Sequence, residues 1–290
     1  MTEFLRQLAS GLALGGVYAI MALALVMIYQ ATQLVNFAQG EMAMFSTYLA
    51  WKLTDSGWPY WRAFAVTVAL SFLGGIAIER IVVRPFAKAP VLASVIVFIG
   101  LALIFNALAG WLYGYSVTDF PTPFEGRPWF GQRFMSAHES GAVMVSLIVL
   151  ALVFAFFRFT PLGLAMRAAA QNPTSSRLVG VKVGWMLAIG WGLAAAIGAV
   201  AGMMAAPIVY LDPNMMAGIL LYAFAGAVLG GIDNPFGAAF GGFAVGVLEN
   251  LMGAYVVGTE VKLSVALAII VGVLVWRPSG LFGRRIVARV

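Results

Sequence analysis

Few residues in this chain of 290 residues are of a type that does chemistry. It has no cysteine and one histidine, His138, which excludes thiol chemistry and the ligand clusters that hold zinc. None of its lysines follows a glycine, so it has no nucleotide-binding P-loop, and neither H-E-x-x-H nor G-x-S-x-G occurs. We therefore expect no catalytic residue, no metal site and no cofactor on this chain. Any ATP hydrolysis that drives it must take place on another chain.

The polar groups of most interest lie within apolar stretches, where they could line a pathway for a solute. These candidates are Asn36, Gln39, Gly40, Glu41, Glu249 and Asn250. A carboxylate in the bilayer core costs about 2.5–3.5 kcal/mol, so Glu41 and Glu249 must each face protein or water. Two interpretations stay open. Either they meet the ammonium group of a zwitterionic solute, or each ties two helices together through Asn36, Asn250 or a nearby hydroxyl.

The elements that position these groups follow from the composition. The chain is 62% hydrophobic and 10% charged, whereas soluble domains have about 45–50% apolar and about 25% charged residues. This excludes a soluble domain, a disordered chain and a nucleic-acid binder. Long runs without charge predict an all-α polytopic membrane bundle of about eight to ten transmembrane or re-entrant helices, in a single domain over residues 1–290. The expected spans are 8–29, 35–51, 63–83, 91–112, 141–158, 186–208, 217–232, 235–256 and 262–276.

The positions of the basic residues predict the orientation. The connections 79–90 and 158–185 and the C-terminal tail should be cytoplasmic, because they hold eleven of the seventeen Lys and Arg residues. The eleven are Arg80, Arg84, Lys88, Arg158, Arg167, Arg177, Lys182, Arg277, Arg284, Arg285 and Arg289. The segment 113–139 is acidic and rich in proline, with Glu125 and Pro128 among its residues, and is expected outside. Glu79 is expected to pair with Arg80 at the cytoplasmic edge.

The loop 158–185 carries two sets of helix signals. Pro161 and Gly163 follow the preceding span, Asn172 fits a helix N-cap before Pro173, and Gly180 fits the position just past a helix end. Two short helices are expected, with these apolar side chains exposed: Leu164, Met166, Ala168 and Leu178. The loop is either an ordinary basic inside loop or a docking element for a cytoplasmic partner. The candidate docking residues are Gly163, Arg167, Ala168, Gln171, Asn172 and Gly180.

Glycine and proline interrupt the apolar sequence near residue 230. Gly230 and Gly231, followed by Pro235 and Gly237, predict a helix break, whose free backbone groups are tolerable only against protein or water. Tight helix packing at small residues is the alternative interpretation.

Several motifs together resemble one family. Asn36-Phe37-Ala38-Gln39-Gly40-Glu41 resembles the N-F-A-x-G-E motif of bacterial branched-chain amino acid ABC transporter permeases of the LivH type. The other matching segments, in the family's order, are Gly11-Leu-Ala-Leu-Gly-Gly-Val-Tyr-Ala19, Arg167-Ala-Ala-Ala-Gln-Asn172-Pro173, Gly230-Gly-Ile-Asp-Asn-Pro-Phe-Gly237 with Gly241-Gly242, Glu249-Asn250, and Arg277-Pro-Ser-Gly-Leu-Phe-Gly283.

The resemblance implies a non-catalytic permease subunit in a bacterial inner membrane. It also implies four kinds of partner besides the bilayer: two cytoplasmic ATP-binding subunits, a second homologous permease, an extracytoplasmic solute-binding protein and a small-molecule solute. In such a complex the loop 158–185 would be the coupling-helix region that contacts the ATPases.

The expected function is therefore inward movement of branched-chain or related small amino acids, driven by ATP hydrolysis on partner subunits. An ABC permease for urea or short amides stays open, because close relatives share these motifs. A secondary transporter driven by an ion gradient is a third hypothesis, and it predicts a relay of membrane carboxylates or histidines. A channel or purely structural subunit would have no ATPase partner.

Overall fold

A computed structural model describes residues 2–87, 89–124, 126, 134–256, 258 and 261–283. The described part is almost entirely helical, with one isolated β-bridge between Thr118 and Leu211. Of the residues discussed above, Lys88, Glu125, Pro128, Arg284, Arg285 and Arg289 lie outside the described residues. The expected all-α polytopic bundle is confirmed.

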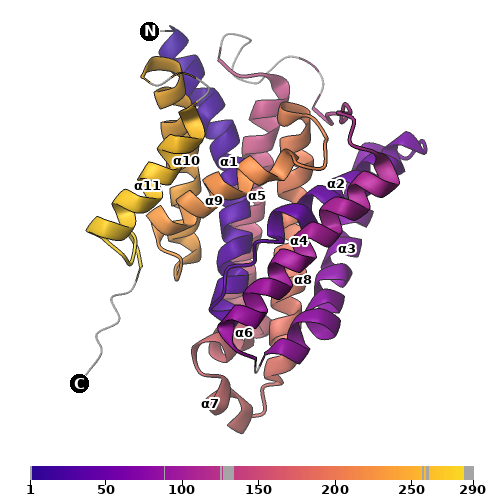
Figure 1. Ribbon diagram of the computed structural model, residues 1–290, viewed down its shortest axis with the longest axis vertical. Helices are drawn as coiled ribbons and strands as arrows, with labels where there is room; N and C mark the ends of the chain where they lie inside the picture. Colours follow the sequence, from indigo (N-terminus) through magenta and orange to yellow (C-terminus); the bar gives the residue numbers. More distant parts are fainter. Residues whose placement is uncertain are drawn as a thin grey trace. The chain divides into compact units, whose positions relative to one another are not determined.

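The helices follow the charge-free runs of the sequence (Figure 1). They are α1 (Thr2–Thr32), α2 (Gln39–Asp55), α3 (Tyr60–Ile78), α4 (Val91–Tyr113), α5 (Ala137–Phe159), α6 (Pro161–Gln171), α7 (Pro173–Leu178), α8 (Val183–Val209), α9 (Met215–Gly230), α10 (Pro235–Tyr255) and α11 (Lys262–Trp276). A π turn, η1 (Glu79–Val83), and a 3-10 turn, η2 (Arg84–Phe86), extend α3.

Six described helices are long and apolar enough to cross a bilayer: α1, α3 with its extension, α4, α5, α8 and α10. The helices α9 and α11 are apolar but shorter. The span expected over 35–51 begins later, at Gln39, because the chain turns at Asn36, whose Oδ1 accepts a hydrogen bond from Ala38 N at 3.1 Å. The resulting helix has 17 residues, about 25 Å at 1.5 Å each, which is less than the hydrocarbon core of roughly 30 Å.

The chain forms two compact units: residues 1–26, 124–146 and 218–290 form the first, and residues 27–123 and 147–217 form the second. In the first unit, glycines bring helices together. A side chain at Gly15 of α1 would lie 2.9 Å from the carbonyl oxygen of Phe243 in α10, and one at Gly226 of α9 would lie 2.6 Å from the backbone nitrogen of Gly242. Such small residues let backbones approach closely, which is how helices associate without a hydrophobic driving force in lipid.

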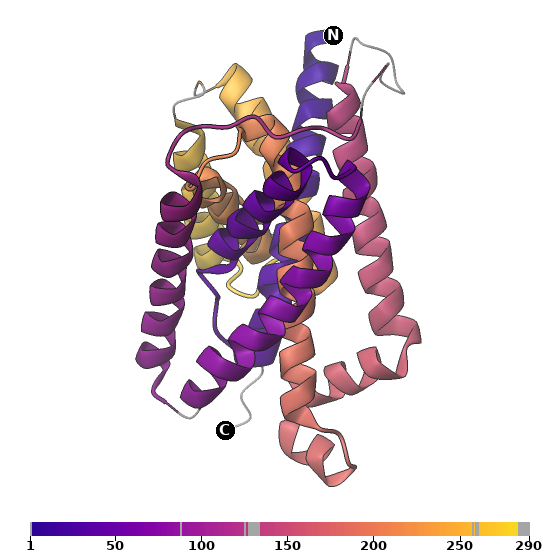
Figure 2. The same ribbon diagram turned by 90° about the vertical axis from the view of Figure 1, so that its right-hand side faces the viewer.

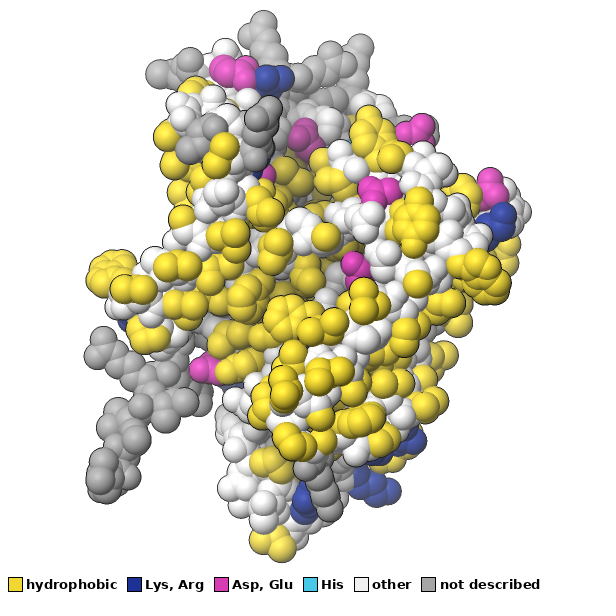
Figure 3. All heavy atoms as spheres, in the orientation of Figure 1, with side chains coloured by type: hydrophobic (Ala, Val, Ile, Leu, Met, Phe, Trp, Pro, Cys, Tyr) yellow, Lys and Arg dark blue, Asp and Glu magenta, His cyan; other side chains and the backbone are white. Residues whose placement is uncertain are grey.

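The second unit is built around α8. Helices α3 and α8 lie side by side in both views (Figures 1 and 2), and α2 packs on α8, α3 and α4. Small residues again set the distances: a Cβ at Gly75 of α3 would lie 2.6 Å from Trp191 O, and one at Gly192 of α8 would lie 2.8 Å from Phe72 O. On this unit the outer face of α4 exposes large apolar side chains, as Figure 3 shows. That face suits contact with lipid.

The break expected near residue 230 is a turn between two helices. α9 ends at Gly230, Gly231 has a φ of +113°, and α10 begins at Pro235 with Asn234 as its N-cap. A side chain at Gly230 would overlap the carbonyl group of Gly237, so both glycines are required by the close approach of the two helix ends. Backbone N–H groups of Leu281 and Phe282 donate to the carbonyls of Leu229 and Gly230 at 2.9 Å and so satisfy the end of α9.

Candidate functional site

Glu41 lies in the first turn of α2, half-buried, within the second unit. Its Oε2 accepts a hydrogen bond from the amide of Asn106 in α4 at 3.3 Å. The same amide donates to Pro213 O at 2.9 Å and to Asn214 Oδ1 at 3.1 Å. Asn106 therefore connects the carboxylate to the segment between α8 and α9, and its two amide hydrogens serve three acceptors. Glu41 keeps acceptor capacity that a solute ammonium group could use.

The neighbours of Glu41 are more enclosed. Asn36 and Gln39 are fully buried, and Gly40 is buried as well. Gln39 Nε2 donates to Ala194 O of α8 at 2.9 Å, while its Oε1 has no hydrogen-bond partner among the residues that the structure describes. Asn36 shapes the turn before α2, and Gln39 holds α2 against α8. Of this group, Glu41 is the side chain left in part accessible.

Glu249 and Asn250 lie in the first unit, on α10, and both are buried. Tyr18 of α1 donates its hydroxyl to Glu249 Oε2 at 2.8 Å, and Lys262 of α11 places its Nζ 3.5 Å from Oε1. Asn250 Nδ2 donates to the backbone and side-chain oxygens of Gln7 at 2.6 and 2.8 Å. These contacts match the interpretation in which Glu249 and Asn250 hold the helices α1, α10 and α11 together.

The two short helices expected in the loop 158–185 are α6 and α7, and side chains cap both. Thr160 Oγ1 accepts from Gly163 N at 3.0 Å, and Asn172 Oδ1 accepts from Ser175 N at 2.9 Å. Gly163 lies against the backbone of Phe156 and Phe157, so a side chain at that position would meet main-chain atoms. Gly180 has a φ of +86°, a conformation that glycine adopts at little cost.

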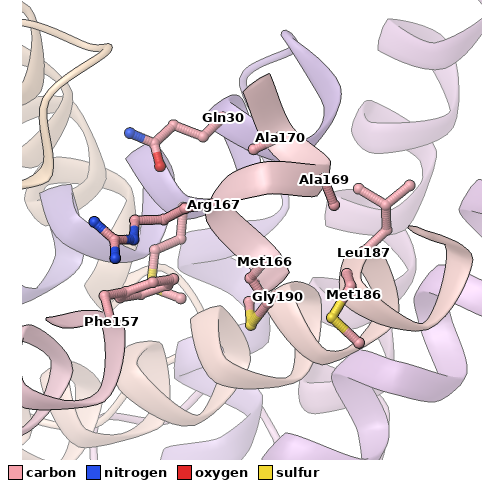
Figure 4. A pocket seen from close by; sticks show the side chains of 10 residues that line it. Gln30, Phe157, Met166, Arg167, Ala169, Ala170, Met186, Leu187 and Gly190 are labelled. Atoms are coloured by element: carbon pink, nitrogen blue, oxygen red, sulfur yellow. The ribbon is translucent and has the colours of Figure 1, made fainter. Parts of the chain in front are cut away.

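One face of α6 packs on α8 and leaves a small cavity (Figure 4). Met166 is 8% exposed and points toward Gly190 of α8, which corrects the expectation that it is exposed: α8 covers this face of α6. The cavity measures about 30 Å³, which is room for only about two or three water molecules, so we do not assign it to an amino acid.

The opposite face of α6 and the end of α7 stay open. Arg167 is exposed and points away from Met166, toward the side where Phe157 and Gln30 lie (Figure 4). Leu164 and Leu178 are 60% and 84% exposed. Ala168, which was also expected to be exposed, is half-buried, and Gln171 and Asn172 are exposed. The loop thus combines a fixed inner face with an outer face of apolar groups and a cation.

The ion pair expected between Glu79 and Arg80 is wrong. Glu79 pairs with Arg84 instead, with 2.7 Å between Oε2 and Nη2, and the Arg80 guanidinium lies over the ring of Trp185. The π turn η1 causes the difference, because a π turn brings residues five apart together.

Comparison with known proteins agrees with this architecture. Residues 7–274 match the model of the family described as branched-chain amino acid transport system, permease component. The chain belongs to this permease family. The LivH permease of the high-affinity branched-chain amino acid transport system of Escherichia coli K12 is 30% identical, over 99% of this chain and 98% of that protein. The BraD permease of Pseudomonas aeruginosa gives the same identity and coverage.

A more distant relative is the probable branched-chain amino acid transport permease LivH of Methanocaldococcus jannaschii, 25% identical over 91% of this chain and 88% of that protein. Among solved structures, PsaBC from Streptococcus pneumoniae in complex with Fab has a TM-score of 0.52, covering 93% of this chain and 91% of that chain. At 11% identity this likeness concerns the fold alone. As a member of the permease family, the chain is a multi-pass membrane transport protein.

Among its described residues, no group of His, Cys, Asp and Glu is arranged to hold a metal ion.

Proposed function

We propose that this chain is the translocation subunit of an ABC importer that moves branched-chain or related small amino acids across a bacterial inner membrane. ATP hydrolysis would take place on partner subunits, and the chain itself would bind no cofactor. Family membership supports the transport role, and the names of the relatives support the substrate class. The outer face of α6 and α7 supports a partner that supplies the energy.

The proposed complex holds two cytoplasmic ATP-binding subunits, a second homologous permease and an extracytoplasmic solute-binding protein. The C-terminus and the α6–α7 loop would be cytoplasmic, following the positive-inside rule. In Figure 3, Lys and Arg side chains gather at the lower end of the second unit, where α6, α7 and the end of α3 lie. This distribution agrees with the proposed orientation.

The proposal that α6 and α7 couple ATP hydrolysis to transport rests on how these two helices are capped, packed and exposed. Each helix has a side-chain cap, Met166 fixes α6 on α8, and exposed Leu164, Leu178 and Arg167 are left for a partner. The proposed coupling residues are Gly163, Arg167, Ala168, Gln171, Asn172 and Gly180. The caps would stabilise the two helices in any loop, so the exposed leucines beside a cation are the feature that favours a docking surface over an ordinary solvated loop.

We propose Glu41 as the first residue that lines the solute pathway. Unlike its buried neighbours it is half-buried, and a single long hydrogen bond holds its carboxylate. A carboxylate recognises the ammonium group of an amino acid, which urea and short amides lack. Asn36, Gln39 and Gly40 support α2 behind it. In this proposal Glu249 and Asn250 hold α1, α10 and α11 together. The turn at Gly230, Gly231, Pro235 and Gly237 stays a candidate for the pathway in the first unit.

The test is uptake by the complete complex in proteoliposomes, with the Arg167→Glu variant and a matched charge reversal, Arg62→Glu, at the far end of α3. We expect Arg167→Glu to abolish ATP-dependent uptake of branched-chain amino acids at unchanged membrane levels, and Arg62→Glu to transport normally. Uptake that persists in Arg167→Glu would contradict the coupling role. Loss of the protein from the membrane would reduce Arg167 to a folding role.

A further inference from the structure

The end of α3 carries an ion pair with an unusual spacing. Glu79 and Arg84 are five residues apart, and in an α-helix the side chains that meet are three or four apart. The π turn η1 places them together, with Arg84 Nη2 2.7 Å from Glu79 Oε2 and Nε 3.2 Å from Oε1. The Glu79 side chain is 5% exposed. Single π turns inside α-helices occur frequently at functional sites.

Two arginines of this segment contact the first residues of α8. Arg84 Nη2 donates to Gly184 O at 2.6 Å. The guanidinium carbon of Arg80 lies 3.3 Å from the centre of the Trp185 ring. A hydrogen bond and a cation–π contact therefore join one turn at the end of α3 to one turn at the start of α8. We call Glu79, Arg80, Arg84, Gly184 and Trp185 the arginine clamp.

The clamp lies where the α6–α7 loop joins the long helices. α7 ends at Leu178 and α8 begins at Val183, so a short connection separates α7 from Gly184 and Trp185. α6 also packs on α8, through Met166. Beyond the clamp, α3 and α8 stay in contact at Gly75 and Gly192, where there is no space for a side chain. If α6 and α7 are displaced, α8 is therefore the first long helix to move. The clamp is the first point along α8 at which that movement can pass to α3.

We propose that the arginine clamp is a transmission element, which makes α3 and α8 move as one body when the α6–α7 loop is displaced. Arg80 and Arg84 are positioning residues in this scheme and do not contact the solute. The proposal rests on the coupling role given above to α6 and α7. A purely structural pair would hold the fold without affecting the ratio of uptake to ATP hydrolysis.

The first test compares clamp variants in the complete complex in proteoliposomes. Arg84→Ala and Trp185→Ala should keep ATP hydrolysis, while the amount of solute taken up per ATP falls by at least about fivefold, the lower range of site-to-site coupling. Trp185→Phe keeps an aromatic ring under Arg80 and should restore the ratio. Arg62→Ala, at the other end of α3, is the control. An unchanged ratio in both alanine variants would overturn the proposal, and lower yield with a normal ratio would reduce the clamp to a structural tie.

The second test measures the movement itself. The chain has no cysteine, so spin labels can be placed at Ile81→Cys, in the extension of α3, and at Lys182→Cys, the N-cap of α8, which are both exposed positions. In the otherwise unchanged complex, the distance between the labels should stay the same with and without ATP, and in Arg84→Ala it should shift or broaden on ATP addition. The proposal is contradicted if the distance between the labels changes on ATP addition while the clamp is intact, or if it stays the same on ATP addition in Arg84→Ala. If no ATPase assembles with the unaltered permease, the proposed function itself fails.

Discussion

Glu41 and Glu249 are the same residue type in opposite surroundings. Glu41 is half-buried and accepts one hydrogen bond, at 3.3 Å, from Asn106. Glu249 is buried, with a tyrosine hydroxyl on one oxygen and a lysine near the other. The first has capacity left for a solute, and the second is already satisfied. The two carboxylates should therefore respond differently to the same substitution.

We predict that Glu41→Gln lowers uptake without affecting assembly. The amide keeps the shape of the side chain but loses the charge that attracts an ammonium group. Because a hydrogen bond to a charged group contributes about 1.5–3 kcal/mol, the loss in uptake should be about tenfold or more. Uptake assays at matched membrane levels measure this. Normal uptake in Glu41→Gln would remove Glu41 from the pathway.

Glu249→Ala should act on stability. It leaves the Tyr18 hydroxyl and the Lys262 ammonium without their partner, at a cost of about 1–3 kcal/mol. Thermal unfolding of the detergent-solubilised protein should show a lower midpoint, while transport per folded molecule stays close to normal. Adding Lys262→Ala to Glu249→Ala should lower the stability little further, because the Glu249–Lys262 ion pair is already broken. Full additivity of the two substitutions would argue against the tie.

At this scale the sequence singled out the two carboxylates, but it did not predict which residues contact them. The carboxylates stand out because charge is rare inside apolar runs. Tyr18 lies 231 positions from Glu249 and Asn106 lies 65 positions from Glu41. No local spacing connects such residues, since the contacts depend on how the helices pack. Glu79 shows the same limit at short range, because its partner depends on a π turn that the sequence pattern does not mark.

At the scale of helices, glycines determine how closely the elements approach. Gly226 of α9 and Gly242 of α10 touch through their backbones, whereas Gly218, also in α9, has open space where a side chain would be. These two glycines of one helix form a matched pair for substitution.

We predict that Gly226→Ala destabilises the protein by about 1–3 kcal/mol, the usual cost of overpacking. Gly218→Ala should be neutral or slightly stabilising, because alanine favours a helix by up to about 1 kcal/mol over glycine. Unfolding midpoints of the two variants measured side by side test this. Equal midpoints would contradict the packing between α9 and α10.

The caps of the loop helices allow a prediction about coupling. Asn172→Ala removes the acceptor for Ser175 N, a loss of about 0.5–2 kcal/mol, and should loosen α7. We expect lower uptake per ATP in Asn172→Ala and recovery in Asn172→Asp, whose carboxylate can cap in the same way. A normal ratio in the alanine variant would show that coupling does not depend on the start of α7.

Helix positions were largely predictable because charge, proline and glycine mark their ends. The two loop helices, the turn at Gly230 and Gly231, and the long spans lie where the sequence pattern placed them. The exposed face of α6 was not predictable in full. Met166 is covered by α8, and nothing within an eleven-residue helix indicates which neighbour will cover it.

At the scale of the whole molecule, the chain has the features of one part of a larger transporter. It belongs to a permease family, spans the membrane several times and has no nucleotide-binding motif. Its loop helices expose leucines and an arginine that no described part of the chain covers. The central claim is that ATPase subunits dock on α6 and α7.

The most direct measurement is site-specific cross-linking in the purified complex. A single cysteine at Leu178→Cys, on the exposed end of α7, should cross-link to a co-purified subunit that contains a P-loop, as identified by mass spectrometry. Leu112→Cys, exposed near the end of α4, should give no such product. An assembly that stays intact through purification but holds no ATPase, and that takes up solute on an ion gradient alone, would contradict the account.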